Sequence, residues 1–447
     1  PATVTLGAVY EDIERIGDPD KYKFKVTLTS RGAAVRQVVL SEFKARAETD
    51  SAADVEKGPR PLTLLSPLTN GQDVYSLANT NLWVAPVGAE AFSTRSFPLD
   101  KLNWRHVKTE AEDMARFAAV LKDADSGEEM LTIVKTYRIE PGSYELDCTL
   151  RLENLSSKAF KTRLQMQGPG GISREGVRQD ARKIKVAYRT GQTGVETVQL
   201  EAPAMAKKIE KGDTEDFYLT SKKSDTQLWS ALTNMYFAAI VRPVDDSQDR
   251  SWMRFSKAQY FPSATLDKDD QNCSYSLISR PMTLAAAGSD AAARTHSLAV
   301  YLGPKDKQVF KHNTIYRALQ YYQTIDFRAC CCPVSIIAPL AFGVMWLMNT
   351  MYMLMGPLGN YGVVIIILVF LVRLAMHPIT KKSQVSMMKM QKLGPKMKEI
   401  QAKYANNKQE MNKQIMAMYR DAGVSPVSGM LPMFLQMPIW IALWTAV

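Results

Sequence analysis

Asn360–Lys381 reads NYGVVIIILVFLVRLAMHPITK, and it says more about the protein than any other segment. The run has no charged residue from Tyr361 to Val372, which is about 18 Å of helix, and Arg373 then interrupts it. Leu374–Pro378 closes the apolar run. Such a pattern predicts a membrane-spanning helix over residues 360–378.

Arg373 needs an explanation, because an arginine at mid-membrane costs about 2.5–3.5 kcal/mol on insertion scales. In one reading the side chain reaches the cytoplasmic head groups, since Pro378 is only five residues away. In the other it faces a hydrated cavity enclosed by helices. The apolar stretch Met430–Val447 contains no acid, and its polar side chains are Gln436 and Thr445. A counter-charge would therefore come from helices outside this chain, from water or from a passing polypeptide.

The apolar stretches on either side raise the question of how often the chain crosses the membrane. Pro333–Asn360 is also uncharged, so Val334–Met355 either spans the bilayer or lies at its interface. The chain starts at Pro1 and stops at Val447 inside an apolar run. We expect it to be an excerpt that lacks segments at both ends.

The region after Pro378 is strongly basic. Residues 379–425 carry ten basic and three acidic residues, a surplus of seven in a chain whose formal charge is +11. A short basic loop between apolar helices is cytoplasmic by the positive-inside rule. Gly394–Pro395 and Tyr404–Asn407 are the expected breaks of a helical hairpin. Methionines at helical spacing, such as Met387 and Met397, form either its packed seam or an adaptable surface for apolar ligands.

Residues 1–328 predict an all-β domain. Tyr22–Leu28 alternates apolar and polar residues, and Ile133–Ile139 and Tyr144–Leu152 flank a turn with proline and glycine, which predicts a hairpin. Further strand-like runs are Lys183–Tyr188, Trp229–Val241 and His296–Leu302, and the polar loops are Glu48–Arg60 and Leu266–Asn272. Strands that recur in this way predict a sandwich or barrel. Lys305–Arg328 has helical spacing and predicts a connecting helix.

The cysteines and histidines do not form a metal-binding pattern. Five cysteines include the run Cys330–Cys332, whose role stays open, and the four histidines are far apart. We expect no metal site and no cofactor. The basic region has few aromatic residues between its lysines, so DNA is not an expected partner.

Three motifs resemble the YidC-type membrane protein insertases. Asn360–Ile367 with Val372–Lys381 resembles the first core helix of that family, and Ser386–Gln391 with Pro395–Lys396 resembles its cytoplasmic hairpin. Gly423–Ile439 resembles the entry to the next helix. The match is dense from Pro333 to Val447, whereas the β-region matches only in size and position. Family members often have cysteine where Met430 stands and asparagine where Ser425 stands.

The resemblance implies a fold and a topology. Residues 1–328 would be a periplasmic supersandwich similar to galactose mutarotases, and residues 329–359 would form an interfacial helix. Residues 360–378 would span the inner membrane, 379–425 would be the cytoplasmic hairpin, and 426–447 would start the next transmembrane helix. An N-terminal anchor and two further helices would complete a multi-pass protein.

The resemblance also implies a function without covalent catalysis. Nascent membrane proteins would enter a hydrophilic groove at Arg373, Met430, Pro432, Gln436 and Met437, alone or with the Sec translocon and its accessory subunits, and would leave into the lipid bilayer. The hairpin would contact the ribosome through its basic surface, to which we assign Lys381, Lys382, Lys389, Lys392, Lys396 and Lys398. Two other classes stay open: a periplasmic sugar-binding or mutarotase-like enzyme domain on a membrane anchor, and a channel or secondary transporter.

Overall fold

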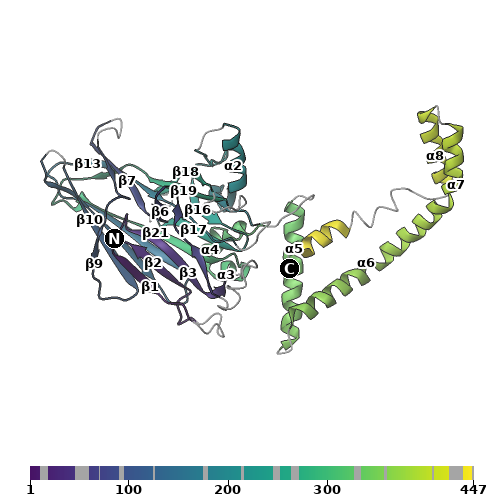
Figure 1. Ribbon diagram of the computed structural model, residues 1–447, viewed down its shortest axis with the longest axis horizontal. Helices are drawn as coiled ribbons and strands as arrows, with labels where there is room; N and C mark the ends of the chain where they lie inside the picture. The colour runs from purple at the N-terminus through teal and green to yellow at the C-terminus, as the bar shows by residue number, and fades with distance from the viewer. Residues whose placement is uncertain are drawn as a thin grey trace. The chain divides into compact units, whose positions relative to one another are not determined.

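The computed structural model divides the chain into two compact units, Pro1–Ile325 and Asp326–Val447. We call them the β-domain and the helical module, and Figure 1 shows strands only in the first. The structure describes all residues except 11–18, 46–59, 70, 90–94, 124–125, 175–179, 213–215, 245–251, 263–270, 327–333, 357–359, 405–406, 422–435 and 445–447.

The largest sheet of the β-domain is antiparallel. Its nine strands lie in the order β15 (Gly194–Glu201), β14 (Lys183–Thr190), β16 (Gln227–Thr233), β17 (Phe237–Val244), β21 (Ala293–Pro304), β12 (Glu145–Asn154), β11 (Glu129–Ile139), β10 (Met114–Lys122) and β9 (Arg105–Val107). The predicted hairpin is confirmed as β11 and β12, with Ile133 opposite Leu152. Buried residues alternate with less buried ones along β12, as expected for a strand with one face in the core.

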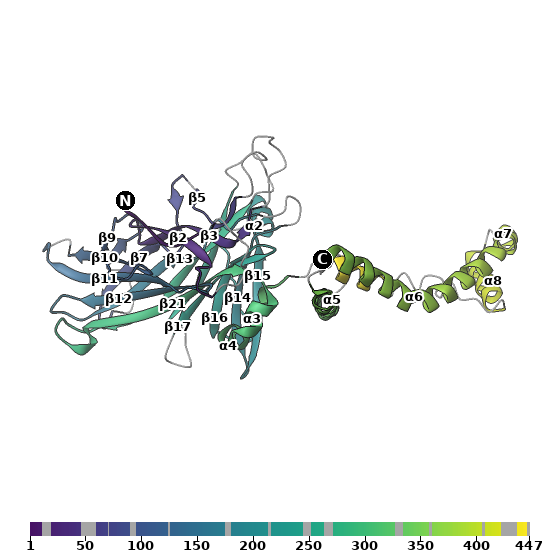
Figure 2. The same ribbon diagram turned by 90° about the horizontal axis from the view of Figure 1, so that it is seen from below.

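Smaller sheets pack with it around one apolar core (Figures 1 and 2). The second sheet has the order β18 (Met253–Phe261), β19 (Asn272–Ser279), β13 (Phe160–Gln167), β7 (Asn79–Pro86) and β8 (Arg95–Pro98), and β20 (Met282–Leu284) pairs with β13. The third contains β1 (Thr3–Gly7), β2 (Phe24–Thr29), β3 (Ala34–Lys44) and β4 (Pro61–Leu65), and β5 (Leu68–Thr69) pairs with β6 (Asp73–Val74). The prediction of an all-β sandwich is confirmed.

Two sequence predictions are refined in the β-domain. The run Trp229–Val241 is not one strand but the hairpin of β16 and β17, because the Asn234 side chain accepts hydrogen bonds from the N–H groups of Tyr236 and Phe237 at 2.9 and 2.6 Å. Such a side-chain turn replaces the next ladder bonds. The two predicted loops lie almost entirely outside the described residues.

The predicted connecting helix is not continuous. It consists of α3 (Lys307–His312), α4 (Thr314–Ala318) and the 3-10 turn η2 (Tyr321–Thr324), which together we call the strap. Asn313 ends α3 and caps α4, since its side chain accepts hydrogen bonds from the N–H groups of Ile315 and Tyr316. Gln320 then adopts a left-handed conformation with φ of 54°, which stops the second helix.

The strap covers the second face of the nine-stranded sheet. Tyr301 and Trp229 point to that face, whereas their neighbours Leu302 and Leu232 belong to the main core. Trp229 donates a hydrogen bond from Nε1 to the carbonyl of Leu319 at 2.9 Å. Phe310, Tyr316 and Tyr321 of the strap complete this aromatic cluster. The strap therefore belongs to the β-domain.

The helical module contains α5 (Val334–Leu354), α6 (Tyr361–Lys392), α7 (Gly394–Lys403), α8 (Lys408–Asp421) and a helix over residues 436–444. The helix α6 does not stop at Pro378, where the predicted span ends, but continues for fourteen residues into the basic region. Pro378 removes one backbone hydrogen bond, while lysine, glutamine and methionine beyond it favour helix. Breaks follow at Leu393 and Tyr404, close to the predicted positions.

Candidate functional site

One face of α6 is packed within the helical module. Val364 and Leu368 are buried on it, one helical turn apart. They form an apolar cluster with Met348 of α5 and Leu443 of the 436–444 helix. Tyr352 of α5 also stacks on Tyr361 at a centroid distance of 4.3 Å. These contacts join three helices along one side of α6.

Arg373 lies on the other face of α6. Ile366 and Phe370, seven and three residues earlier, are 70% and 63% exposed, and Arg373 itself is exposed. Within the described part of the chain, no hydrogen bond or ion pair of its guanidinium is found. Among the same residues, α6 is also the one helix that is long and apolar enough to cross a membrane, and Pro339–Leu354 is a shorter apolar segment. The charge is thus on an uncovered face of the candidate span.

The other residues predicted for the groove are only partly described. Gln436 is half-buried and Met437 is 36% exposed, both at the start of the 436–444 helix. Met430 and Pro432 lie outside the described residues. The 436–444 helix contacts the packed side of α6 through Leu443, and in the described region no bond joins Gln436 to Arg373. The structure thus describes three of the five predicted groove residues, and the groove stays a prediction.

The basic surface is exposed throughout. It comprises the end of α6 and the start of α7, with the predicted side chains Lys381, Lys382, Lys389, Lys392, Lys396 and Lys398. Some methionines of the hairpin pack in its seam, and others are exposed on its surface. Met397 is half-buried in the α7–α8 seam, where its sulfur lies 3.4 Å from the hydroxyl of Tyr419. Met387 and Met416 are 47% and 64% exposed, as an adaptable surface requires.

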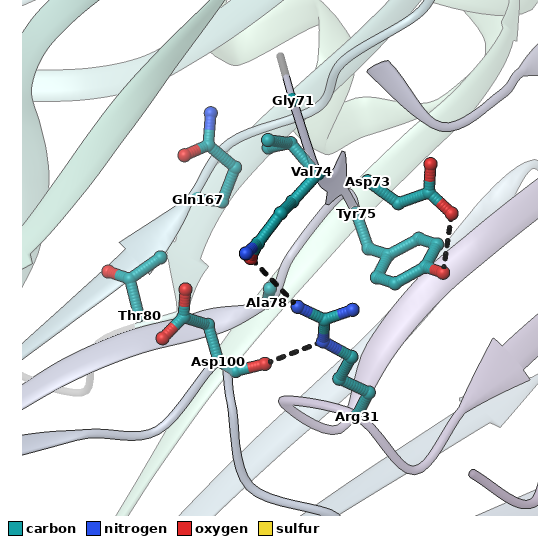
Figure 3. Close-up of a pocket in the computed structure, with 10 residues that line it drawn as sticks. Arg31, Gly71, Asp73, Val74, Tyr75, Ala78, Thr80, Asp100 and Gln167 are labelled. Atoms are coloured by element: carbon teal, nitrogen blue, oxygen red, sulfur yellow. Dashed lines mark hydrogen bonds between the residues drawn. The ribbon is translucent and has the colours of Figure 1, made fainter. Parts of the chain in front are cut away.

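Sequence reasoning missed a cavity in the β-domain. It has a volume of about 480 Å³ and is lined by ends of strands that are far apart in sequence, including Arg31, Asp100 and Gln167 (Figure 3). Neither a motif nor a periodicity marks these residues, because only the sheet topology brings them together. Among the described residues, those of the cavity included, no group of three or more histidine, cysteine or acidic side chains is placed to hold a metal ion.

Comparison with protein families identifies both units. Residues 20–329 match the model of the YidC periplasmic domain, which is more than half of the chain, and residues 351–447 match the 60Kd inner membrane protein. The chain belongs to the YidC family. The β-domain is accordingly the periplasmic domain, and the helical module belongs to the inner membrane.

Curated relatives agree with this assignment. The membrane protein insertase YidC of Anaeromyxobacter sp. (strain Fw109-5) is 26% identical over 94% of this chain and 66% of its own length. The corresponding protein of Treponema denticola is 25% identical over 72% of this chain and 51% of its own length. This YidC chain therefore spans between half and two thirds of the length of these relatives.

A solved structure also resembles the periplasmic domain. The galactose mutarotase-like protein of Lactobacillus casei has 11% sequence identity and a TM-score of 0.34, covering 67% of this chain and all of the other. Nothing about ligand or activity follows from a similarity this low.

Proposed function

We propose that this YidC chain is the main part of a multi-pass insertase that moves transmembrane segments of nascent proteins from the cytoplasm into the bilayer. The observation that carries the proposal is Arg373, a charged side chain on the uncovered face of the single candidate span among the described residues. A fixed charge at this depth is expensive unless water or a partner solvates it. The names of the curated relatives support the same function.

The proposed groove is formed by Arg373 with Met430, Pro432, Gln436 and Met437. A polar terminus or short loop of the client enters it, and Arg373 attracts the acidic residues of that segment. No acidic residue occurs in α5, in α6 or in residues 430–447, so the arginine has no standing partner in these segments of the chain. The apolar part of the client then partitions into lipid, where hydrophobic burial drives the step. No covalent bond is made or broken.

The hairpin is proposed to receive the client. Exposed lysines on α6 and α7 suit the phosphates of ribosomal RNA, and the exposed Met387 and Met416 suit apolar segments of varied sequence. The residues beyond Arg373 give α6 about 28 Å of further helix, which extends the basic end out of a hydrocarbon core of about 30 Å. Cooperation with the Sec translocon and its accessory subunits belongs to the same proposal.

The experiment compares Arg373→Ala, Arg373→Lys and a control, Lys413→Ala at an exposed position of α8 outside the assigned basic surface, in cells depleted of the native insertase, each in a chain completed to the length of its relatives. Arg373→Ala should reduce insertion of strictly dependent clients most where the translocated segment is acidic. Arg373→Lys keeps the charge and should retain part of the activity, and Lys413→Ala should match the parent. Full insertion by both Arg373 variants would overturn the role of the arginine.

A further inference from the structure

Two residues with strained backbones lie next in sequence to segments that line the cavity of Figure 3. Ala33 and Leu77 are buried and adopt positive φ angles of 48° and 57°, which residues with a Cβ rarely do. They adjoin the lining segments at Arg31 and Ala78. Strain of this kind persists only where the surroundings enforce it, and it gathers at ligand clamps.

Two buried side chains of β11 enforce these conformations. The hydroxyl of Tyr137 donates a hydrogen bond to the carbonyl of Ala33 at 2.8 Å, and Nζ of Lys135 donates one to the carbonyl of Leu77. Both side chains are fully buried, and as residues i and i+2 they share one face of the nine-stranded sheet. Burial lowers the pKa of Lys135 to about 8. The strand β11 thus makes side-chain hydrogen bonds to both loops, at Ala33 and at Leu77.

Backbone hydrogen bonds tie the loops to each other and to the next strand. The N–H of Asn79 donates to the carbonyl of Gly32 at 3.1 Å, and the N–H of Val35 donates to that of Ser76 at 2.8 Å. The N–H of Gln167 donates to the carbonyl of Ala78 at 2.8 Å. The wall is therefore fixed before any ligand arrives, which reduces the entropy lost on binding.

The lining alternates donors and acceptors. Arg31 donates from Nε to the carbonyl of Asp100 at 3.3 Å and from Nη2 to the side chain of Gln72 at 3.3 Å. The Asp100 carboxylate points away from the guanidinium toward Thr80 (Figure 3), and it has no hydrogen-bond or ion-pair partner in the described part of the β-domain. Gln167 is 5% exposed, with its amide anchored on Ser274 at 2.7 Å. Planar polar groups thus face the cavity at fixed angles.

An aromatic residue stands at the rim. The hydroxyl of Tyr75 donates to the carboxylate of Asp73 at 3.1 Å (Figure 3). Partial burial and this bond raise the pKa of Tyr75 above its ordinary value. A neutral ring of this kind offers an apolar face beside the polar groups.

We propose that this cavity binds a small saccharide of one or two rings. Vicinal hydroxyls both donate and accept, so they match a carboxylate, a guanidinium and amides better than a charged ligand does. Asp73 and Asp100 disfavour an anion, and Arg31 disfavours an amine. A bound peptide would need apolar pockets for alternate side chains, whereas the apolar side chains of the lining are Val74 and Ala78. The volume is at the lower end of the roughly 300–1,000 Å³ of small-molecule sites.

The test uses the full chain in phospholipid nanodiscs, because maltoside detergents carry a sugar head group that would compete. Ligand-observed saturation-transfer NMR is recorded with glucose, galactose, mannose, N-acetylglucosamine, maltose, lactose and sucrose, and with trialanine as a peptide probe. We expect saturable binding of at least one sugar. Asp100→Asn should weaken it by roughly tenfold, the effect of losing a charged hydrogen bond.

Controls separate binding from folding. Asp290→Asn changes the same chemical group at an exposed position and should bind like the parent. Arg31→Gln gives a second pocket variant, and circular dichroism verifies that each variant is folded. Absence of saturable binding to every sugar, equal binding by the parent and folded Asp100→Asn, or preferential binding of trialanine would each overturn the proposal. Insertion activity is a separate assay, so either proposal can fail alone.

Discussion

Large apolar side chains are buried in the periplasmic domain but exposed along one face of α6 in the helical module. The largest fully buried side chains, such as Trp229, Tyr137 and Tyr275, all lie in the periplasmic domain. On α6 of the helical module, Ile366 and Phe370 are mostly exposed. Water drives the first arrangement, whereas lipid is the natural solvent of the second. The large buried side chains of the described residues are therefore concentrated in the domain without the proposed groove.

The largest expected effect is loss of Trp229. Trp229→Ala leaves a cavity under the strap and an unpaired carbonyl at Leu319, so it should lower the free energy of unfolding of the periplasmic domain by about 3–5 kcal/mol. Urea unfolding of the full chain in nanodiscs, followed by circular dichroism, measures it. Ile366→Ala on the exposed face of α6 should leave the same transition unchanged. A loss below about 1 kcal/mol for Trp229→Ala would contradict the comparison.

A pH-dependent effect comes from Lys135. Because its pKa falls from 10.5 to about 8 on folding, the unfolded chain binds more protons between these two values. The free energy of unfolding therefore rises with pH across that window, by about 3 kcal/mol. Below pH 8 the full cost of burying the charged lysine is present. The unfolding free energies of the parent and Lys135→Met, measured from pH 7 to 10.5, give the difference. If the difference in unfolding free energy between the parent and Lys135→Met did not change with pH, folding would not lower the pKa of Lys135.

A smaller effect is expected from the hydrogen bond beneath the cavity wall. Tyr137→Phe leaves the buried carbonyl of Ala33 without a donor and should cost about 1–3 kcal/mol of unfolding free energy. Tyr218→Phe is the matched control, since Tyr218 is 68% exposed and should change nothing measurable. Equal stability of the two variants would mean that the left-handed turn at Ala33 needs no support.

The smallest effect is expected in the hairpin. Met397→Ala removes one half-buried side chain from the α7–α8 seam and should cost less than about 1 kcal/mol. Hydrogen exchange should become faster in α7 and α8 and stay constant in the periplasmic domain. Met416→Ala, at a 64% exposed position, should leave exchange unchanged. Faster exchange in the periplasmic domain as well would contradict the separation of the two units.

Local patterns were enough for much of the fold. Alternation in Tyr144–Leu152 and the turn before it predicted β12 and its hairpin with β11, and the uncharged run before Arg373 predicted the candidate span. Gly394–Pro395 predicted the start of α7. These features depend on neighbouring residues, so periodicity and turn chemistry reveal them.

Long-range features were not predictable in the same way. The strap breaks at Asn313 and Gln320 because it must follow the surface of a sheet built from distant strands. Lys135 appears in the sequence as an ordinary lysine in a strand, and only the fold shows its bond to Leu77. The proposed groove depends on how α6 meets residues from another helix, which a sequence pattern does not specify.

The continuity of α6 through Pro378 has a mechanical consequence. Gln391 follows Arg373 by eighteen residues, or about five helical turns, so both side chains leave the helix axis in the same direction. Gln391 at the basic end and Arg373 therefore point to the same side of the helix. A rotation of the basic end about the helix axis would therefore also turn the guanidinium, as far as the helix stays rigid at Pro378. Because α6 is continuous, the orientation of its basic end and the orientation of Arg373 are linked.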